Sequence, residues 1–483
     1  MTIRPRSLRD VALTGVAALL AILVSSTVSD ADLWGHLRFG ADVLRTGHLT
    51  AHDPYSFTSD IAWINHEWLS EVILAAVYGP LGAAGLNLLK IAIIGGIAAL
   101  TWRMAARSGA RAFSAAVLTA LIVVSTYTRT QSLRPQLFSV LLFAVLMELM
   151  DRMERDGRSR WLAIAFLFCC WANIHGGWIV GLGAFGLWSL FDRRRLKLLA
   201  VAAGATLINP YGFGLWRFLY DTVGLARPEI SDWRPLFALP GAIIGLELAL
   251  PALAAVAVLR TRTVPPLSRM GIIAILAFST YRVGRTDAFM QIAIAWTCAP
   301  AILAWTNRVE IGSAQTGRMA APRLLNGYVA AAMLLGACGF AATRMSRITI
   351  DGDWKPDTRA AAFLEQRVPD SRVLTWFDWG EYAIWHLADS GVRVSMDGRR
   401  ETVYSARVIQ DHFAFYSNAT PDAWRYPDTI GADHIWIPRR LPIVPVLERH
   451  GWHELFSTDQ SVVLSRSTTT PFAQPLVASF AFP

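Results

Sequence analysis

The sequence predicts a mainly α-helical protein that crosses a membrane about eleven times and carries an α/β domain at its C-terminal end. Of the 483 residues, 54% are hydrophobic and 17% are charged, whereas a soluble globular protein is about 25% charged. Apolar runs near membrane-spanning length recur up to residue 343 and then stop. The fold class is therefore a polytopic membrane protein with a C-terminal domain outside the membrane.

Basic residues account for the net charge of +9, and they concentrate in short segments between the apolar runs. The positive-inside rule places such segments in the cytoplasm. The charge therefore reports topology, and we expect no nucleic-acid partner. These segments are residues 4–9, 103–111, 151–160, 192–197, 260–269 and 307–318.

A cytoplasmic N-terminus places every basic segment inside the cell and the C-terminal region outside it. We expect a multi-pass protein of the bacterial inner membrane, with a membrane domain at 1–343 and a periplasmic domain at 344–483. Two short runs, 161–174 and 197–208, could be re-entrant or broken helices. The expected spans are 11–28, 72–102, 112–128, 135–150, 161–174, 177–191, 197–208, 241–259, 270–283, 287–305 and 324–343.

Nearly every unusual polar residue of the membrane domain falls on the predicted external side. Polar groups near membrane depth are costly, so such a set indicates one functional cavity. The alternative is that external loops are polar for solvation alone. The set comprises Asp30, Asp32, His36, His66, Glu67, Arg134, Asn173, His175, Asn209, Arg282 and Arg285.

The predicted first external loop, residues 29–70, opens with the sequence SDADLWGHLRFG. If residues 31–46 form a helix, Asp32 and His36 lie one turn apart on one face, opposite a leucine-rich side. Such a helix would lie along the membrane interface. A carboxylate and an imidazole so placed can share a metal ion, or act as a base and its partner. The alternative is a solvated face with Trp34 as an interfacial anchor.

This loop resembles the GT-C superfamily of membrane glycosyltransferases, which transfer sugars from polyprenyl-phosphate or polyprenyl-diphosphate donors. The stretch DLWGHLR, residues 32–38, is similar to the Asp-x-x-x-His-x-Arg motif of oligosaccharyltransferase catalytic subunits. The resemblance implies that Asp32 is the catalytic or metal-binding aspartate and that Asp30 completes a D-x-D. A divalent cation, Mg²⁺ or Mn²⁺, would then bind Asp32 and His36, although many GT-C enzymes need none.

The remainder of the loop resembles predicted bacterial membrane glycosyltransferases that carry DP-x-S-F-T followed by W-x-x-H-E-W-L. Residues 53–58 and 63–69 match these two patterns. The resemblance places His66 and Glu67 at the outer end of the second span. Glu67 suits metal sharing or hydrogen bonding to an acceptor hydroxyl, and the alternative is that it caps a helix.

Three arginines, Arg134, Arg282 and Arg285, are expected at external helix ends. Guanidinium groups bind phosphate bidentately and would stabilise the charge on a leaving lipid phosphate. The alternative is that they anchor helix ends by snorkelling. His175, in the turn NIHGG, either reaches the cavity or belongs to a tight turn.

Residues 344–483 alternate helical and strand patterns, which predicts a small, mostly parallel or mixed sheet. The phrase TWFDWGEYAIW, residues 375–385, resembles the WWDYG element with which oligosaccharyltransferases recognise an acceptor peptide. Trp376 and Asp378 would correspond to its aromatic and acidic residues. The alternative is a strand-to-helix turn capped by Asp378. The expected helices are 357–368, 381–387 and 403–416, and the expected strands are 372–376, 392–396, 434–438 and 462–466.

The sequence therefore predicts an inverting GT-C hexosyl- or pentosyltransferase with Asp32 as base or metal ligand, assisted by Asp30, His36 and Glu67. Its expected partners are a polyprenyl-phosphate-linked sugar, membrane lipids and an external glycan, lipid or protein acceptor. The long later external loop of full oligosaccharyltransferases is missing after residue 283, which favours transfer of a monosaccharide. An oligosaccharyltransferase-like enzyme, a lipid or sugar transporter, and an envelope scaffold with a degenerate cavity stay as alternatives.

Overall fold

The computed structural model of the chain divides into two compact units. The first, called the helical unit, comprises Met1–Thr27 and Leu81–Arg347. The second, called the α/β unit, comprises Val28–Pro80 and Ile348–Pro483. The structure describes residues 8–225, 227, 229–230, 233–316, 323–350 and 352–467. The basic residues predicted at 4–7 and 317–318, and the end of the predicted external domain at 468–483, lie outside these ranges.

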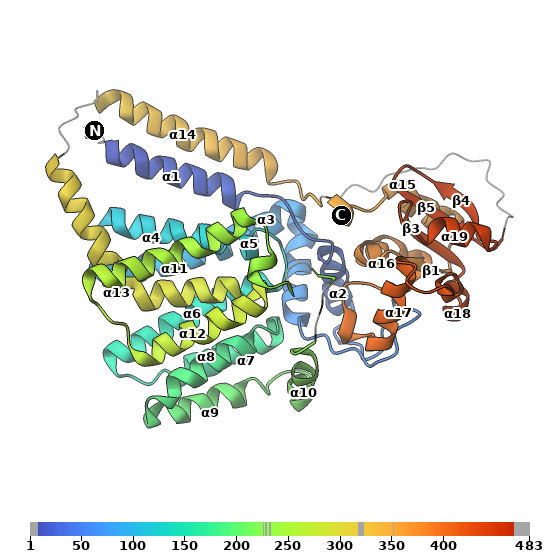
Figure 1. Cartoon of the computed structure of the whole chain (residues 1–483), viewed down its shortest axis with the longest axis horizontal. Helices are drawn as coiled ribbons and strands as arrows, with labels where there is room; N and C mark the ends of the chain where they lie inside the picture. The colour runs from blue at the N-terminus through green and yellow to red at the C-terminus, as the bar shows by residue number, and fades with distance from the viewer. Residues whose placement is uncertain are drawn as a thin grey trace. The chain divides into compact units, whose positions relative to one another are not determined.

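Long helices running side by side make up the helical unit (Figure 1). α13 packs against α4, α6, α11 and α12, and α1 lies beside α14. The helices are α1 (Leu8–Val24), the later part of α3 (Trp68–Arg107), α4 (Ala112–Ser125), α5 (Tyr127–Thr130), α6 (Gln136–Asp156), α7 (Trp161–Ile174), α8 (Trp178–Leu190), α9 (Leu196–Ala205), α10 (Phe213–Thr222), α11 (Gly241–Thr261), α12 (Leu267–Arg282), α13 (Asp287–Thr316) and α14 (Arg323–Arg344).

Three helices among the described residues are long and apolar enough to cross a membrane: Trp68–Arg107, Gly241–Thr261 and Gly284–Arg308. Shorter apolar helices occupy several other predicted spans. By length and composition, the described helices support three crossings. The number of eleven crossings stays a prediction. The two runs expected to be re-entrant or broken each form one short continuous helix, α7 and α9.

A five-stranded mixed sheet with the strand order β2-β1-β3-β5-β4 forms the centre of the α/β unit. β1 pairs in parallel with β2 and β3, whereas β5 pairs antiparallel with β3 and β4. This agrees with the predicted mixed sheet, although β4 is an additional strand. The strands are β1 (Arg372–Thr375), β2 (Arg393–Val394), β3 (His434–Pro438), β4 (His453–Ser457) and β5 (Ser461–Ser465).

Successive side chains of each strand point to opposite faces of the sheet, and both faces of this sheet carry apolar residues. Helices therefore cover both faces. Val373 and Trp436 pack with residues of α15 and α16 on one face, whereas Leu374 and Ile435 pack with α17 and α19 on the other. The helix predicted at 403–416 begins only at Ala406, where the Ser405 hydroxyl accepts a bond from a backbone N–H. The helices are α15 (Thr358–Arg367), α16 (Gly380–Leu387), α17 (Ala406–Tyr416), α18 (Tyr426–Ile430) and α19 (Val444–Arg449).

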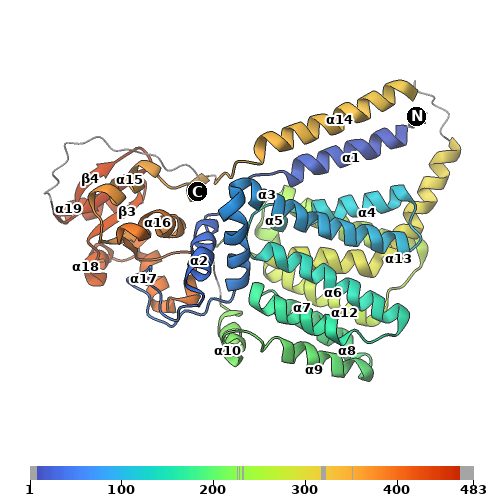
Figure 2. The same cartoon turned by 180° about the vertical axis from the view of Figure 1, so that it is seen from behind.

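The predicted first external loop belongs to this α/β unit. Its helix α2 (Leu33–Thr46) lies beside α16 in both views (Figures 1 and 2). The segment around Ser56 runs parallel to β2: the Val394 N–H donates to the Tyr55 carbonyl at 3.0 Å, and the Phe57 N–H donates to the Val394 carbonyl at 3.1 Å. The DP-x-S-F-T motif therefore extends the edge of the sheet.

Candidate active site

Helix α2 positions the predicted aspartate and histidine. Asp32 occupies the N-cap position, and both Trp34 and His36 on the first turns are buried. α2 packs against α16 inside the α/β unit, and its position along the membrane interface stays a prediction. Gly35 permits this close packing: a Cβ at that position would overlap the carboxylate of Glu381 and lie 2.9 Å from its Cγ.

Two carboxyl groups meet beside Gly398. The point where a Cβ of Gly398 would stand lies 2.8 Å from Glu381 Oε1 and still closer to Asp32 Oδ1. Asp32 is half-buried, whereas Glu381 on α16 is only 3% exposed and its Oε2 has no hydrogen-bond partner among the described residues. Burial and then the neighbouring charge of Asp32 raise the pKa of Glu381 well above its usual range. The surroundings of Glu381 therefore favour the protonated form of its carboxyl more than water does.

His36 binds a second acid that sequence reasoning missed, Glu71 in the first turn of α3. The His36 Nδ1 lies 3.2 Å from Glu71 Oε1, and the Asn65 amide donates to Glu71 Oε2 at 2.5 Å. Burial alone would lower the pKa of His36, but the hydrogen bond to Glu71 and the charges of Glu67, Glu71 and Asp32 raise it to about 9. The contact with Glu71 therefore favours the cationic form of His36 near neutral pH.

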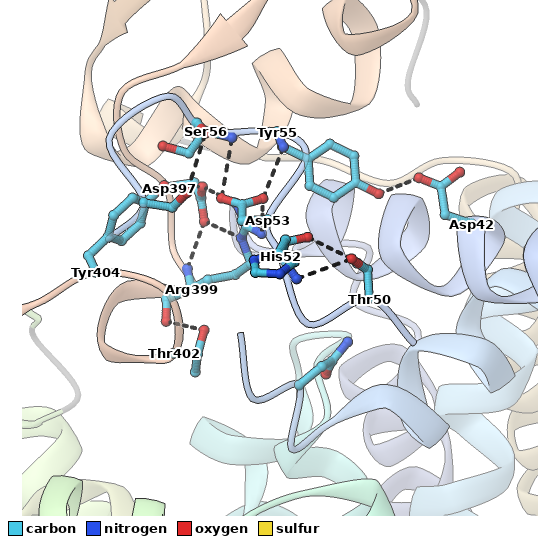
Figure 3. Close-up of polar contacts among 12 residues, drawn as sticks. Asp42, Thr50, His52, Asp53, Tyr55, Ser56, Asp397, Arg399, Thr402 and Tyr404 are labelled. Carbon is cyan, nitrogen blue, oxygen red and sulfur yellow. Dashed lines mark hydrogen bonds and ion pairs between the residues drawn. The ribbon is translucent and has the colours of Figure 1, made fainter. Parts of the chain in front are cut away.

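Asp397 and Arg399 flank Gly398 and fix the turn that carries it. The Arg399 guanidinium donates to Asp53 at 2.7 and 2.9 Å and to Asp397 at 2.8 and 2.7 Å (Figure 3). The Tyr404 hydroxyl also donates to Asp397, at 2.6 Å. Burial would raise the pKa of Asp397, but Arg399 holds it below its usual range. Both Asp397 and Arg399 are buried, so solvation does not account for their presence in this loop.

The other predicted acids of the first loop lie close to Asp32 and His36 in the chain or in space. Asp30 is buried two residues before Asp32. Glu67 is half-buried immediately before α3, with its Oε1 3.5 Å from His66 Nε2, and its charge contributes to the raised pKa of His36. The structure thus gathers Asp32, His36 and Glu67 and adds Glu71 and Glu381 to them. Glu71 could have been found from its position one turn after Glu67.

Trp376 and Asp378 lie on the turn between β1 and α16. The Trp376 indole donates to Asp378 Oδ2 at 3.1 Å, and its ring packs edge-on against Tyr416 at 4.7 Å. The N-cap position of α16 is Trp379 rather than Asp378. Of the acidic residues in 375–385, it is Glu381 that lies beside Asp32 in the structure. Glu381 was not singled out from the sequence, because the resemblance directs attention to Asp378.

Two of the predicted phosphate-binding arginines lie close together in the helical unit. Gln136, at the start of α6 and two residues after Arg134, donates to the backbone carbonyl of Arg285 at 3.0 Å. The Arg285 guanidinium lies 5.6 Å from the ring centre of Trp233. Arg282 is exposed at the last turn of α12. These positions fit both phosphate binding and anchoring of helix ends.

His175 is buried between α7 and α8. Its Nδ1 receives the Gly177 N–H at 3.0 Å and lies 2.7 Å from the Ser139 hydroxyl. That hydroxyl accepts the Trp171 indole N–H at 2.7 Å, so its own proton points to His175. The hydrogen bonds therefore assign the proton of the neutral imidazole to Nε2. The NIHGG sequence is thus a turn whose histidine is held by packed neighbours.

A buried polar network in the helical unit was missed by sequence reasoning. Arg129 donates from its Nε to both oxygens of Asp287, at 3.0 and 2.9 Å, and both residues are buried. Glu247 on α11 accepts from Thr128 at 3.2 Å and from Gln291 at 2.8 Å. The signal was available, because charged residues beside or inside apolar runs are costly unless they are paired.

The fold of the chain is similar to those of solved membrane glycosyltransferases. No protein-family model matches the chain, and no curated protein matches it. The apo oligosaccharyltransferase of Archaeoglobus fulgidus superposes with a TM-score of 0.58 at 11% identity, over 95% of this chain and 74% of that one. Apo ArnT from Cupriavidus metallidurans gives 0.53 at 14% identity, over 95% and 98%. The mycobacterial arabinofuranosyltransferase AftD gives 0.51 at 14% identity, over 98% and 42%. All three are membrane glycosyltransferases by name, so the likeness agrees with the fold that the resemblance of the first loop implies.

The predicted divalent cation lacks a complete ligand set. Among the described side chains, no group of three or more His, Cys, Asp or Glu residues is arranged to hold a metal ion. The Archaeoglobus fulgidus oligosaccharyltransferase was crystallised in complex with Zn and sulfate. A divalent cation at Asp32 and His36 stays a prediction, and the chemistry below is derived without it.

Proposed function

We propose that the protein is an integral-membrane glycosyltransferase that moves one sugar from a polyprenyl-phosphate-linked donor to an acceptor outside the cytoplasm. The observation that carries the proposal is the half-buried Asp32 at the head of α2, whose carboxyl group meets that of Glu381 beside Gly398, with the buried His36 one turn further along the helix. The GT-C fold of the chain supports it.

Asp32 is the base in this proposal. It takes the proton of the acceptor hydroxyl while that oxygen bonds to the anomeric carbon from the face opposite the leaving group. The bond between the anomeric carbon and the donor phosphate breaks, and the phosphate oxygen keeps the electron pair. The configuration of the sugar is therefore inverted. The positive charge of His36 would stabilise the Asp32 carboxylate in its ionised form. Glu67 and Asp30 would assist by stabilising the protonated form of His36.

The predicted arginines would bind the lipid phosphate. ArnT, one of the structural neighbours, has been solved bound to undecaprenyl phosphate. We assign the equivalent anion here to Arg134, Arg282 and Arg285, because guanidinium groups stay charged and bind phosphate oxygens bidentately. The proposal includes the topology predicted from charge: a multi-pass protein of the inner membrane with a cytoplasmic N-terminus and a periplasmic C-terminal domain.

The acceptor is proposed to be a glycan, lipid or protein outside the cytoplasm. An oligosaccharyltransferase neighbour was solved with a tethered acceptor peptide. Acceptor contacts by Trp376 and Asp378 belong to the proposal, in which their mutual hydrogen bond would orient the indole ring toward the acceptor. Substrate contacts by His66 and His175 likewise stay predictions.

Lipid extracts from a deletion strain test the donor half of the proposal. Mass spectrometry of polyprenyl-phosphate sugars should find one species enriched in deletion cells, and enriched again in cells that carry Asp32→Asn protein at the wild-type level. The wild-type gene should return that species to its normal amount. Identical lipid-linked sugars in all three strains would contradict transfer from such a donor and favour a scaffold.

A further inference from the structure

A small cavity in the α/β unit is not used by the chemistry proposed above. It has a volume of about 240 Å³ and lies between the C-terminal half of α2, the loop that follows it, and the segment before α3. This volume is below the roughly 300 Å³ at which pockets for drug-sized ligands begin, so the cavity suits a single ring. Its lining includes Phe39, Asp42, Arg45, Tyr55, Trp63 and Asn65.

One wall of the cavity is aromatic and rigid. The Phe39 ring centre lies 5.3 Å from that of Tyr55 and 5.2 Å from that of Trp63, and all three side chains are buried. Behind them, the Arg399 guanidinium lies 4.8 Å from Phe39 and 4.8 Å from Trp63. Because Asp53 and Asp397 lock this guanidinium, the wall is preorganised and loses little freedom when a ligand packs on it.

The lining of the cavity also includes polar residues. Arg45 donates to Asp42 at 2.8 Å. The Tyr55 hydroxyl donates to the other oxygen of the same carboxylate (Figure 3). Arg45 and Arg38 both bind Asp42, so neither guanidinium is left unpaired for a phosphate, and a purely apolar ligand would leave the ion pair desolvated. The other polar residues of the lining are Thr46, His48, Thr50 and Asn65. Adjacent hydroxyl groups on a neutral ring match such donors and acceptors.

The cavity is joined to the candidate active site by hydrogen bonds. Asn65 lines the cavity, its amide donates to Glu71, and Glu71 binds His36. From the size of the cavity, its paired polar rim and its aromatic wall, we infer that this cavity is a saccharide subsite that holds one sugar ring of the acceptor. That the bound sugar belongs to the acceptor rests on the proposed function. That the cavity binds a sugar ring rests on the cavity alone.

Saturation-transfer NMR on the full chain tests sugar binding directly. The protein is held in nanodiscs or in a detergent without a sugar head group, and the probes are the methyl glycosides of D-glucose, D-galactose, D-mannose and N-acetyl-D-glucosamine. Thr50→Trp fills the cavity from an exposed position, and Arg45→Gln removes the guanidinium from its rim. Leu44→Trp is the matched control, because Leu44 is exposed on the same helix and does not line the cavity.

The expected result is saturation transfer to at least one glycoside that falls at least about tenfold in Thr50→Trp and Arg45→Gln but persists in Leu44→Trp. Signals that are equal in the wild type and both cavity variants, or no signal for any probe, would overturn the inference. Asp32→Asn separates it from the proposed function, because that variant should keep sugar binding. If its cells also keep normal glycans, the proposed function fails while the sugar subsite stands.

Discussion

Replacing Arg399 with methionine should destabilise the α/β unit more than any single exposed substitution. The guanidinium donates four hydrogen bonds to Asp53 and Asp397, whose side chains are fully buried. Methionine keeps much of the side-chain length but leaves both carboxylates without their cation. Breaking a buried pair in this way costs about 3–5 kcal/mol.

This free-energy loss converts to a fall in the melting temperature of roughly 6–20 °C for a unit of this size. Tryptophan fluorescence during heating measures it, because Trp63, Trp379 and Trp436 are buried in the same core. Arg407→Met is the matched control: the side chain of Arg407 is 90% exposed and its ion pair with Asp411 spans 3.7 Å, so its melting temperature should not change measurably. A melting temperature for Arg399→Met equal to that of Arg407→Met would refute the role given to the Asp53–Arg399–Asp397 cluster.

Three further changes follow from the same geometry. Because the pKa of His36 is raised from 6.5 to about 9, the stability that its pair with Glu71 contributes is fully present below pH 6.5 and is lost as the pH rises through 9; Glu71→Gln should flatten this part of a melting-temperature profile. The pKa of Glu381 is also raised, so the stability gained from its protonated form is fully present below the pKa of the unfolded chain, about 4.3, and is lost progressively as the pH rises. Glu381→Gln should keep the fold at pH 7 and reduce that loss in the same profile. Gly35→Ala drives a methyl group into Glu381 and should cost about 1–3 kcal/mol in denaturant unfolding, whereas Gly79→Ala, with nothing within 4 Å, should be neutral or stabilising. Equal behaviour of variant and reference in any of the three would contradict the corresponding contact.

Local patterns in the sequence predicted the elements well where periodicity is strong. The strand HIWIP and the helix EYAIWHL form as β3 and α16, because alternating and helical apolar spacing each fit one buried face. β4 was missed because its sequence, HELFS, has polar residues at most positions and lies at the sheet edge. The number of membrane crossings is weakly constrained, since several apolar runs are short.

The grouping of the first loop with the C-terminal region could not be predicted from local pattern. Asp53 and Arg399 are 346 positions apart, and neither flanking sequence specifies the other. For the same reason Glu381 was overlooked: only the close approach permitted by Gly35 and Gly398 brings it to Asp32. Asp32, His36 and Glu67 were found because they lie within one loop, where helical spacing places two of them together.

The most direct test of the central claim is the structure of the envelope glycans in cells whose only copy of the protein is Asp32→Asn. Asp411→Asn is the matched control, because it makes the same change at an exposed site of the α/β unit. We expect mass spectrometry to find a glycan lacking one sugar in the deletion strain and in Asp32→Asn cells, and a complete glycan in wild-type and Asp411→Asn cells. Complete glycans in Asp32→Asn cells, with the protein at its normal level, would contradict a glycosyltransferase that uses Asp32 as its base.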